Sequence, residues 1–167
     1  MVIVAGPSGS GKTTVGRLLA VRLQAVFVDA DDLHPAANVA KMRSGVPLDE
    51  NDRRPWLESV RHLVDARLAG PRPTVLACSA LQRGHRQALG VDRPGVALVW
   101  LEAPPEALAP RLQARPGHFF PPHLLSSQLA AEERPAAEEA AIVVVADRPV
   151  TEVVEAITAT LGRPDRR

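Results

Sequence analysis

The sequence predicts an α/β protein in which helices flank a five-stranded parallel sheet. Short apolar runs alternate with segments of helical periodicity along the chain. These runs are apolar throughout rather than alternating with polar residues, which is typical of parallel strands buried on both faces. Such β–α–β units join through right-handed crossovers. The 167 residues fit one domain over 1–162, followed by a tail at 163–167 that we expect to fray.

Five apolar runs mark the expected strands. They are Val2–Ala5, Val26–Asp29, Thr74–Cys78, Val96–Leu101 and Ile142–Ala146. The connector Glu132–Ala141 before the last run is rich in Ala, Glu and Pro, and its sequence assigns it no conformation. Because ligands of parallel sheets bind beyond the carboxyl ends of the strands, we expect the functional residues to follow these runs.

Helical spacing marks the segments between the strands. In the longest segment Trp56, Val60 and Val64 recur at helical spacing, and Pro55 is expected in the first turn, where proline is tolerated. In the first segment Val15, Leu19 and Leu23 share one face. The expected helices are Lys12–Gln24, Ala36–Arg43, Asp52–Ala69, a short one from Gln82, Glu106–Arg115 and Val150–Leu161.

Composition excludes several classes of partner. The net charge is +1 and no long basic run occurs, so neither nucleic acid nor a membrane surface is indicated as a partner. Aromatic residues make up 3% and Tyr is absent, which argues against base stacking. No apolar run has the length of a membrane span. The lone Cys78, and a start directly in a strand without a signal-peptide pattern, lead us to expect a cytoplasmic protein.

A phosphate-binding loop follows the first strand. Residues 6–13 fit the pattern G-x-x-x-x-G-K-[ST] between an apolar strand and a helix. Glycines let successive backbone N–H groups point at phosphate oxygens, and the helix adds its positive dipole end. We expect Lys12 to reach the β- and γ-phosphates and Thr13 to ligate Mg²⁺. The alternative is a Gly-rich turn with an incidental lysine. The expected ATP-binding residues here are Gly6, Pro7, Ser8, Gly9, Ser10, Gly11, Lys12, Thr13 and Thr14.

Two carboxylates end the second strand. Asp29 and Asp31 are two residues apart, so in an extended chain both point to one side. A kinase needs an acceptor for the proton of the attacking hydroxyl and a carboxylate near Mg²⁺. We assign Asp31 to the hydroxyl and Asp29 to the metal. The alternative is an acidic cap for the next helix, a role that Asp32 fits best.

A series of short motifs resembles the bacterial gluconokinases, which transfer a phosphoryl group from ATP to D-gluconate. The most specific are residues 29–35, with sequence DADDLHP, and residues 117–120, with sequence GHFF. The likeness runs from about Val2 to Val150. It implies a P-loop kinase fold of the nucleoside monophosphate kinase type, with a helical substrate-binding segment, a lid at about 115–128, and a possible homodimer.

The resemblance also implies an acceptor site for a hydroxylated carboxylate, which requires cations and polar groups. For each basic residue the alternative is a solvated surface charge. The residues expected to bind gluconate are Asp31, His34, Lys41, Arg53, Arg83, Arg86, His118 and Gln128.

Two arginines precede the lid. Arg111 and Arg115 are expected to contact ATP, either at the transferred phosphate or stacked on adenine. Lys12, Asp31 and Arg115 form the expected catalytic set. The alternative for both arginines is a helix C-terminus stabilised by the dipole.

The sequence thus predicts an ATP-dependent, Mg²⁺-using gluconokinase. One rival is another small-molecule kinase of this fold, such as a shikimate kinase, and a second is an ATP-binding protein without transfer activity. Three departures from the family pattern are Pro7 in the loop, Gln82 and His85 after the third strand, and Glu132–Pro135 in the connector. Of these, the change at Gln82 and His85 bears most directly on acceptor specificity.

Overall fold

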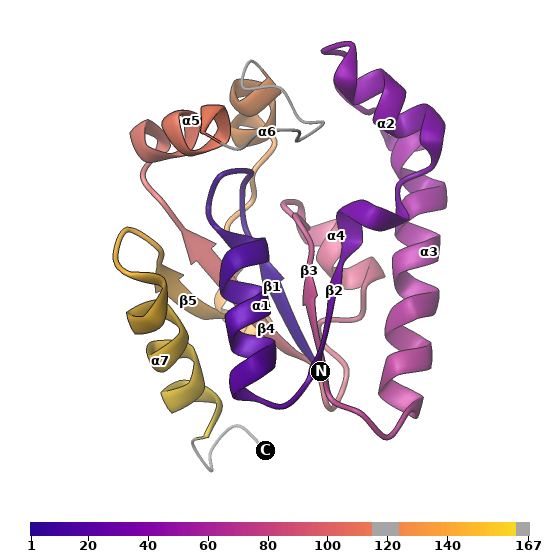
Figure 1. The fold of residues 1–167 in the computed structure, drawn as a ribbon. Coiled ribbons are helices and arrows are strands. Elements are labelled where there is room, and N and C mark those ends of the chain that lie inside the picture. The colour runs from indigo at the N-terminus through magenta and orange to yellow at the C-terminus, as the bar shows by residue number, and fades with distance from the viewer. Residues whose placement is uncertain (115–123, 163–167) are drawn as a thin grey trace.

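The computed structural model describes residues 1–114 and 124–162. Five parallel strands form one sheet in the order β2-β3-β1-β4-β5 (Figure 1). This confirms the predicted fold class. The strands are β1 (Val2–Ala5), β2 (Val26–Asp29), β3 (Thr74–Ala77), β4 (Ala97–Glu102) and β5 (Ile142–Val145).

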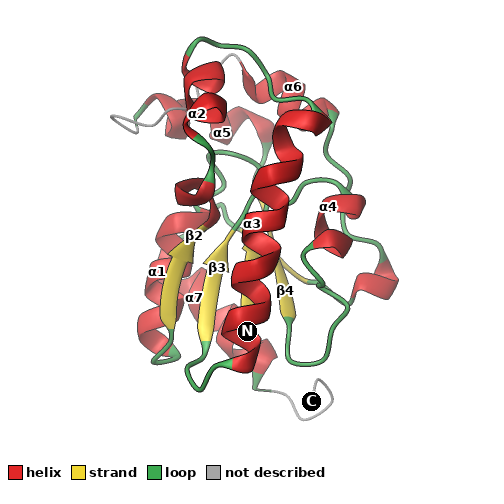
Figure 2. Cartoon of the chain, turned by 90° about the vertical axis from the view of Figure 1, so that its right-hand side faces the viewer, coloured by secondary structure: helices red, strands yellow, loops and turns green. Residues whose placement is uncertain are grey.

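Helices cover both faces of the sheet, and the side chains of β1 contribute to the core on each face. Its alternate side chains point to opposite faces, so Val2 and Val4 join the core under α1 (Lys12–Arg22) and α7 (Val150–Leu161). Ile3 and Ala5 join the core under α3 (Glu50–Ala69), which crosses the other face (Figure 2). The remaining helices are α2 (Ala36–Arg43), α4 (Arg83–Ala88), α5 (Pro105–Gln113) and α6 (Leu125–Ala130), with 3-10 turns at Ala30–Leu33 and Ala137–Glu139.

The edge strand β5 departs from the prediction of burial on both faces. Ile142 and Val144 are buried, whereas Val143 and Val145 are 50% and 52% exposed. Helix α7 packs on one face of this strand, and the other face retains exposed valines. A continuous apolar run therefore does not show whether one or both faces of a strand are covered by helices.

Helix α3 begins earlier than the sequence indicated. The Asp49 side chain accepts from the backbone N–H of Asp52, and the Asp52 side chain accepts from the N–H of Asp49. This reciprocal capping box starts the helix at Glu50. Pro55 consequently lies beyond the first turn, where its missing N–H costs one helical hydrogen bond. The expectation that it sits in the first turn was wrong because the cap lies upstream.

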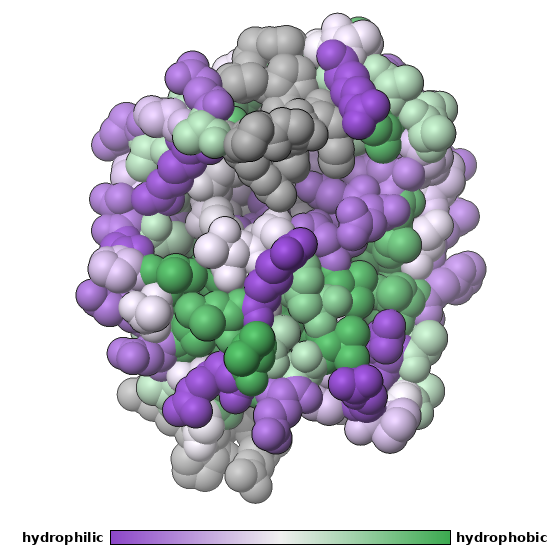
Figure 3. Space-filling model, in the orientation of Figure 1, coloured by the Kyte–Doolittle hydropathy of each residue, from purple (hydrophilic) through white to green (hydrophobic). Residues whose placement is uncertain are grey.

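The surface that carries α1 and α7 has apolar side chains gathered below the middle of the view, with polar ones around the rim (Figure 3). Val21 of α1 is the most exposed of the large apolar residues described, at 76%. Within residues 1–114 and 124–162, no helix is both long and apolar enough to span a membrane.

Candidate active site

The glycines of the loop between β1 and α1 are required by its geometry. Gly6, Gly9 and Gly11 have φ values of 138°, 86° and 94°, a region that disfavours other residues. A Cβ on Gly6 would lie 2.6 Å from the carbonyl oxygen of Leu101, and one on Gly9 would lie 2.7 Å from that of Leu108. A Cβ on Gly11 would meet nothing within 4 Å. The loop is therefore packed against β4 and α5 on its outside and open at its helix end.

A large cavity lies over this open end. Its volume is about 950 Å³, and Lys12, Thr13 and Thr14 line it together with Arg111. The Arg111 guanidinium donates to the carbonyl oxygen of Ala146 at 3.1 Å and to the Asp147 carboxylate at 3.1 Å. Arg111 thus joins α5 to the end of β5 at the cavity wall. Of the expected ATP-binding residues, Ser8, Gly9 and Gly11 also line this cavity, whereas Arg115 lies outside the described residues.

Asp29, the last residue of β2, faces the phosphate loop. The Thr13 hydroxyl donates to Asp29 Oδ2 at 2.8 Å, and the backbone N–H of Asp31 donates to Asp29 Oδ1 at 3.2 Å. Asp29 therefore caps the following 3-10 turn, a role that the sequence favoured for Asp32. The sequence interpretation missed this because the chain turns directly at the strand end.

The oxygen atoms of Thr13 and Asp29 form a donor set suited to Mg²⁺, which is commonly held by one or two protein oxygens, substrate phosphates and water. In the described part of the chain, no group of three or more His, Cys, Asp and Glu side chains is placed to hold a metal by itself. The residues present fit a metal that is shared with a phosphate ligand.

A second cavity, of about 220 Å³, adjoins the first. The α2–α3 hairpin, the segment after β3, and α6 enclose it. Ser8, Lys12 and Asp31 line both cavities, so they form the boundary between the two. The other lining residues are His34, Met42, Pro47, Leu48, Glu50, Arg53, Ser79, Leu81, Gln82, His85, Leu124, Ser127, Gln128 and Ala131.

His34 is fixed in the wall of this second cavity. Its ring stacks on Trp56 with the centroids 4.5 Å apart, and Trp56 Nε1 donates to the carbonyl oxygen of Ala30 at 2.8 Å. Burial lowers the pKa of His34, with a smaller lowering from Arg53 opposed by Asp31. The neutral imidazole is thus favoured near pH 7, and its Nδ1 lies 3.5 Å from the side-chain nitrogen of Asn38.

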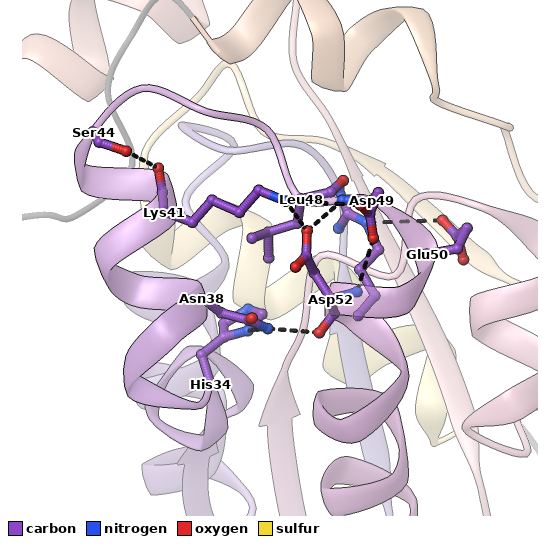
Figure 4. A network of polar contacts seen from close by, with 9 residues as sticks. His34, Asn38, Lys41, Ser44, Leu48, Asp49, Glu50 and Asp52 are labelled. Carbon is purple, nitrogen blue, oxygen red and sulfur yellow. Dashed lines mark hydrogen bonds and ion pairs between the residues drawn. The ribbon is translucent and has the colours of Figure 1, made fainter.

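Lys41 and Arg53, both expected at the acceptor, have different surroundings, and Figure 4 shows those of Lys41. Lys41 forms an ion pair with Asp52 and lies 3.7 Å from Asp49, which joins α2 to the start of α3. It does not line the cavity. Arg53 does line it, and its Nη2 donates to the carbonyl oxygen of Leu48 at 3.2 Å.

The two α4 arginines are bound to glutamates of the connector before β5 and not to the second cavity. Arg83 pairs with Glu138 at 2.8 Å, and Arg86 is fully buried against Glu139. Neither lines the cavity, so we do not retain them in the proposed binding site. Their neighbours Gln82 and His85 do line the cavity, so this segment reaches it through other side chains than the two arginines.

Residues from the far end of the chain complete the cavity. Gln128 of α6 lines it, and its Oε1 accepts from the backbone N–H of Ser8 at 2.7 Å. The Oε1 atom of Gln128 is thus bound to the phosphate loop, and its amide NH₂ group points away from that bond. His118 lies outside the described residues.

Sequence reasoning missed several lining residues, among them Glu50, Gln82 and His85. His85 Nε2 lies 3.2 Å from Glu50 Oε2, which connects α4 with α3 across the cavity rim. The departure from the family pattern at Gln82 and His85 was the one available signal. Cys78, between β3 and these residues, is buried, which raises the pKa of its thiol to about 12; it is a packed side chain.

Comparison with known proteins agrees with this arrangement. A family model described as an AAA domain matches residues 1–149. The thermosensitive gluconokinase of Escherichia coli is 43% identical, covering 84% of this chain and 75% of that protein. The gluconokinase of Gluconobacter oxydans is 42% identical, covering 92% and 86%.

Solved structures distinguish family from fold. The crystal structure of a gluconokinase from Sinorhizobium meliloti superposes with a TM-score of 0.84 at 40% identity, covering 97% of this chain and 91% of that one. A shikimate kinase from Aquifex aeolicus reaches a TM-score of 0.60 at 20% identity, covering 96% and 94%, which shows a shared fold alone. With its phosphate loop, its two adjoining cavities and these relatives, the chain belongs to the gluconokinase family of P-loop kinases.

Proposed function

We propose that the protein transfers the γ-phosphoryl group of ATP to the 6-hydroxyl of D-gluconate, forming 6-phospho-D-gluconate and ADP. We infer D-gluconate as the acceptor from its gluconokinase relatives. The observation that carries the proposal is that Ser8, Lys12 and Asp31 line both cavities. A nucleotide phosphate in one cavity and a hydroxyl in the other meet only at such a boundary.

The nucleotide belongs in the larger cavity. The open end of the loop and the start of α1 offer backbone N–H groups and a positive dipole to its phosphates. Lys12 Nζ donates to the Pro7 carbonyl oxygen at 2.9 Å, which holds the ammonium over the loop. Thr13 and Asp29 would hold Mg²⁺, which supplies positive charge to the β- and γ-phosphates when bound.

The acceptor belongs in the smaller cavity, whose volume suits a small polar ligand better than a nucleotide. Arg53 supplies a cation for the carboxylate of gluconate, since a guanidinium binds carboxylates in a two-pronged geometry. His34 and Gln128 supply N–H groups for the hydroxyls. The 6-hydroxyl then lies at Asp31, at the boundary with the phosphate.

The chemical step follows from this placement. The 6-hydroxyl oxygen forms a bond with the γ-phosphorus as the bond from that phosphorus to the bridging oxygen breaks. Asp31 accepts the hydroxyl proton, and Lys12 stabilises the charge that develops on the phosphoryl oxygens and on ADP. Arg115, outside the described residues, stays a prediction, as do the homodimer and the cytoplasmic location.

An acceptor panel tests the proposal. Purified protein is given Mg²⁺ and ATP with gluconate, shikimate, glucose or no acceptor, and ADP release is followed. We expect rapid release with gluconate alone, because glucose and shikimate leave Arg53 or the hydroxyl-binding groups without matched partners. Preferred turnover of shikimate, or ADP release that no acceptor stimulates, would contradict the proposal.

A further inference from the structure

Arg86 is a fully buried cation whose three guanidinium nitrogens are all bound. Nε and Nη2 donate to the two carboxylate oxygens of Glu139 at 2.6 and 2.8 Å. Nη1 donates to the carbonyl oxygens of Leu81, Ala80 and Glu133 at 2.9, 3.2 and 2.9 Å. The exposed fraction of the side chain is 0% for Arg86 and 6% for Glu139. This set of contacts joins α4 to the connector between α6 and β5.

One of the carbonyl groups that Arg86 holds belongs to a residue of the acceptor cavity's wall, Leu81, and a second belongs to its neighbour Ala80. Leu81 lines that cavity, together with Ser79 and Gln82 on either side. Ala80 has φ of 39°, a left-handed conformation that a residue with a Cβ adopts only when its surroundings impose it. The backbone N–H of Glu133 also donates to the Leu81 carbonyl at 3.0 Å. Arg86 and Glu133 therefore hold residues 80–81 in a strained backbone conformation, through hydrogen bonds to their carbonyl groups.

The same segment reaches the phosphate loop, because the backbone N–H of Gly6 donates to the carbonyl oxygen of Ser79 at 3.3 Å. A displacement of residues 79–82 would alter the acceptor cavity on one side and this contact on the other. A buried ion pair often stabilises a fold no better than well-packed apolar residues of similar volume. Holding three carbonyl groups in one place, in contrast, requires a donor such as guanidinium.

We propose that Arg86 and Glu139 are positioning residues for acceptor binding: they fix residues 79–82 in the shape that the acceptor requires, without touching it. This inference rests on the proposed function for the identity of the acceptor. It predicts that disturbing the pair weakens acceptor binding more than ATP binding.

The chain offers a matched control. Arg83 and Glu138 form a neighbouring pair at 2.8 Å that joins the same helix to the same connector. Their side chains are 45% and 60% exposed, and the side chain of Arg83 makes no described hydrogen bond to the cavity wall. Arg83→Ala therefore removes an ion pair of similar location and leaves residues 79–82 untouched.

The test compares Glu139→Gln, the double variant Arg86→Met with Glu139→Leu, and Arg83→Ala. Apparent constants for gluconate and for ATP are measured below the melting temperature of each protein, with amide hydrogen exchange of residues 79–82. In Glu139→Gln and in the double variant we expect the apparent constant for gluconate to rise about tenfold, which corresponds to the loss of about one hydrogen bond. The apparent constant for ATP should change by less than about twofold. Exchange should accelerate at residues 79–82, and Arg83→Ala should match the parent.

The double variant separates positioning from stability. It leaves no buried charge, so it is expected to melt nearer the parent than Glu139→Gln does. It also leaves the three carbonyl groups without their donor, so the raised gluconate constant should persist. A double variant that regains both stability and the parent gluconate constant would overturn the inference, and so would gluconate and ATP constants that rise together. If the parent does not use gluconate, the proposed function fails, and the exchange rates at residues 79–82 decide the inference.

Discussion

Replacing Arg53 by Met tests the placement of the acceptor carboxylate most directly. Arg53 lines the acceptor cavity from the first turn of α3. Its visible partners are the Leu48 carbonyl oxygen at 3.2 Å and Glu50 at 3.9 Å. Glu50 is 67% exposed, so water replaces Arg53 around it at little cost. Arg53→Met should therefore remove a binding cation without unfolding α3.

The size of the effect follows from the type of bond. A hydrogen bond to a charged group contributes roughly 1.5–3 kcal/mol. The apparent constant for gluconate should rise by about ten- to a hundredfold, since each 1.4 kcal/mol corresponds to about a factor of ten. The ATP constant should change by less than about twofold, because Arg53 does not line the nucleotide cavity.

Lys41→Met is the matched control. Lys41 is a cation of the same hairpin, but it is bound to Asp52 and does not line the acceptor cavity. Its loss should leave the gluconate constant within about threefold of the parent, since no charged bond to the acceptor is broken. Steady-state ADP release at varied gluconate and at varied ATP measures both constants. An unchanged gluconate constant in Arg53→Met, or a larger rise in Lys41→Met, would refute the assignment of the carboxylate to Arg53.

Three further predictions concern turnover and stability. Lys12→Ala should abolish ADP release without lowering the melting temperature, because its ammonium serves phosphate rather than the core; unchanged turnover would refute the assignment. Asp31→Asn should keep ATP binding, measured by calorimetry, and lose roughly two to four orders of magnitude in turnover. The bond to Arg86 lowers the pKa of Glu139 from 4.5, so its stabilisation is present above that pH and lost as pH falls through the folded-state pKa. The melting temperature of Glu139→Gln should fall less steeply in that acidic range.

The sequence by itself determined the phosphate loop and the parallel sheet. The loop is readable because its glycines meet local demands: three positive φ values within six residues, next to a strand and a helix. The strands can be predicted because each is a continuous apolar run, which is typical of a strand in a parallel sheet. The sequence also placed Asp29 and Asp31 at the end of β2, but it treated the chain there as extended, whereas Asp31 lies in the 3-10 turn that Asp29 caps.

Only the tertiary structure decided which charged side chains line the cavities. Lys41 and Arg53 are equivalent in the sequence, yet Asp52 binds the first and the cavity receives the second. The sequence led us to expect Arg86 at the substrate, and the structure places it against Glu139, far along the chain, outside the lining of the second cavity. A flexible charged side chain takes whichever opposite charge the packing brings within reach, and that partner comes from a distant segment. Local sequence patterns cannot predict this pairing, because it depends on how α2, α3 and α4 are arranged in space.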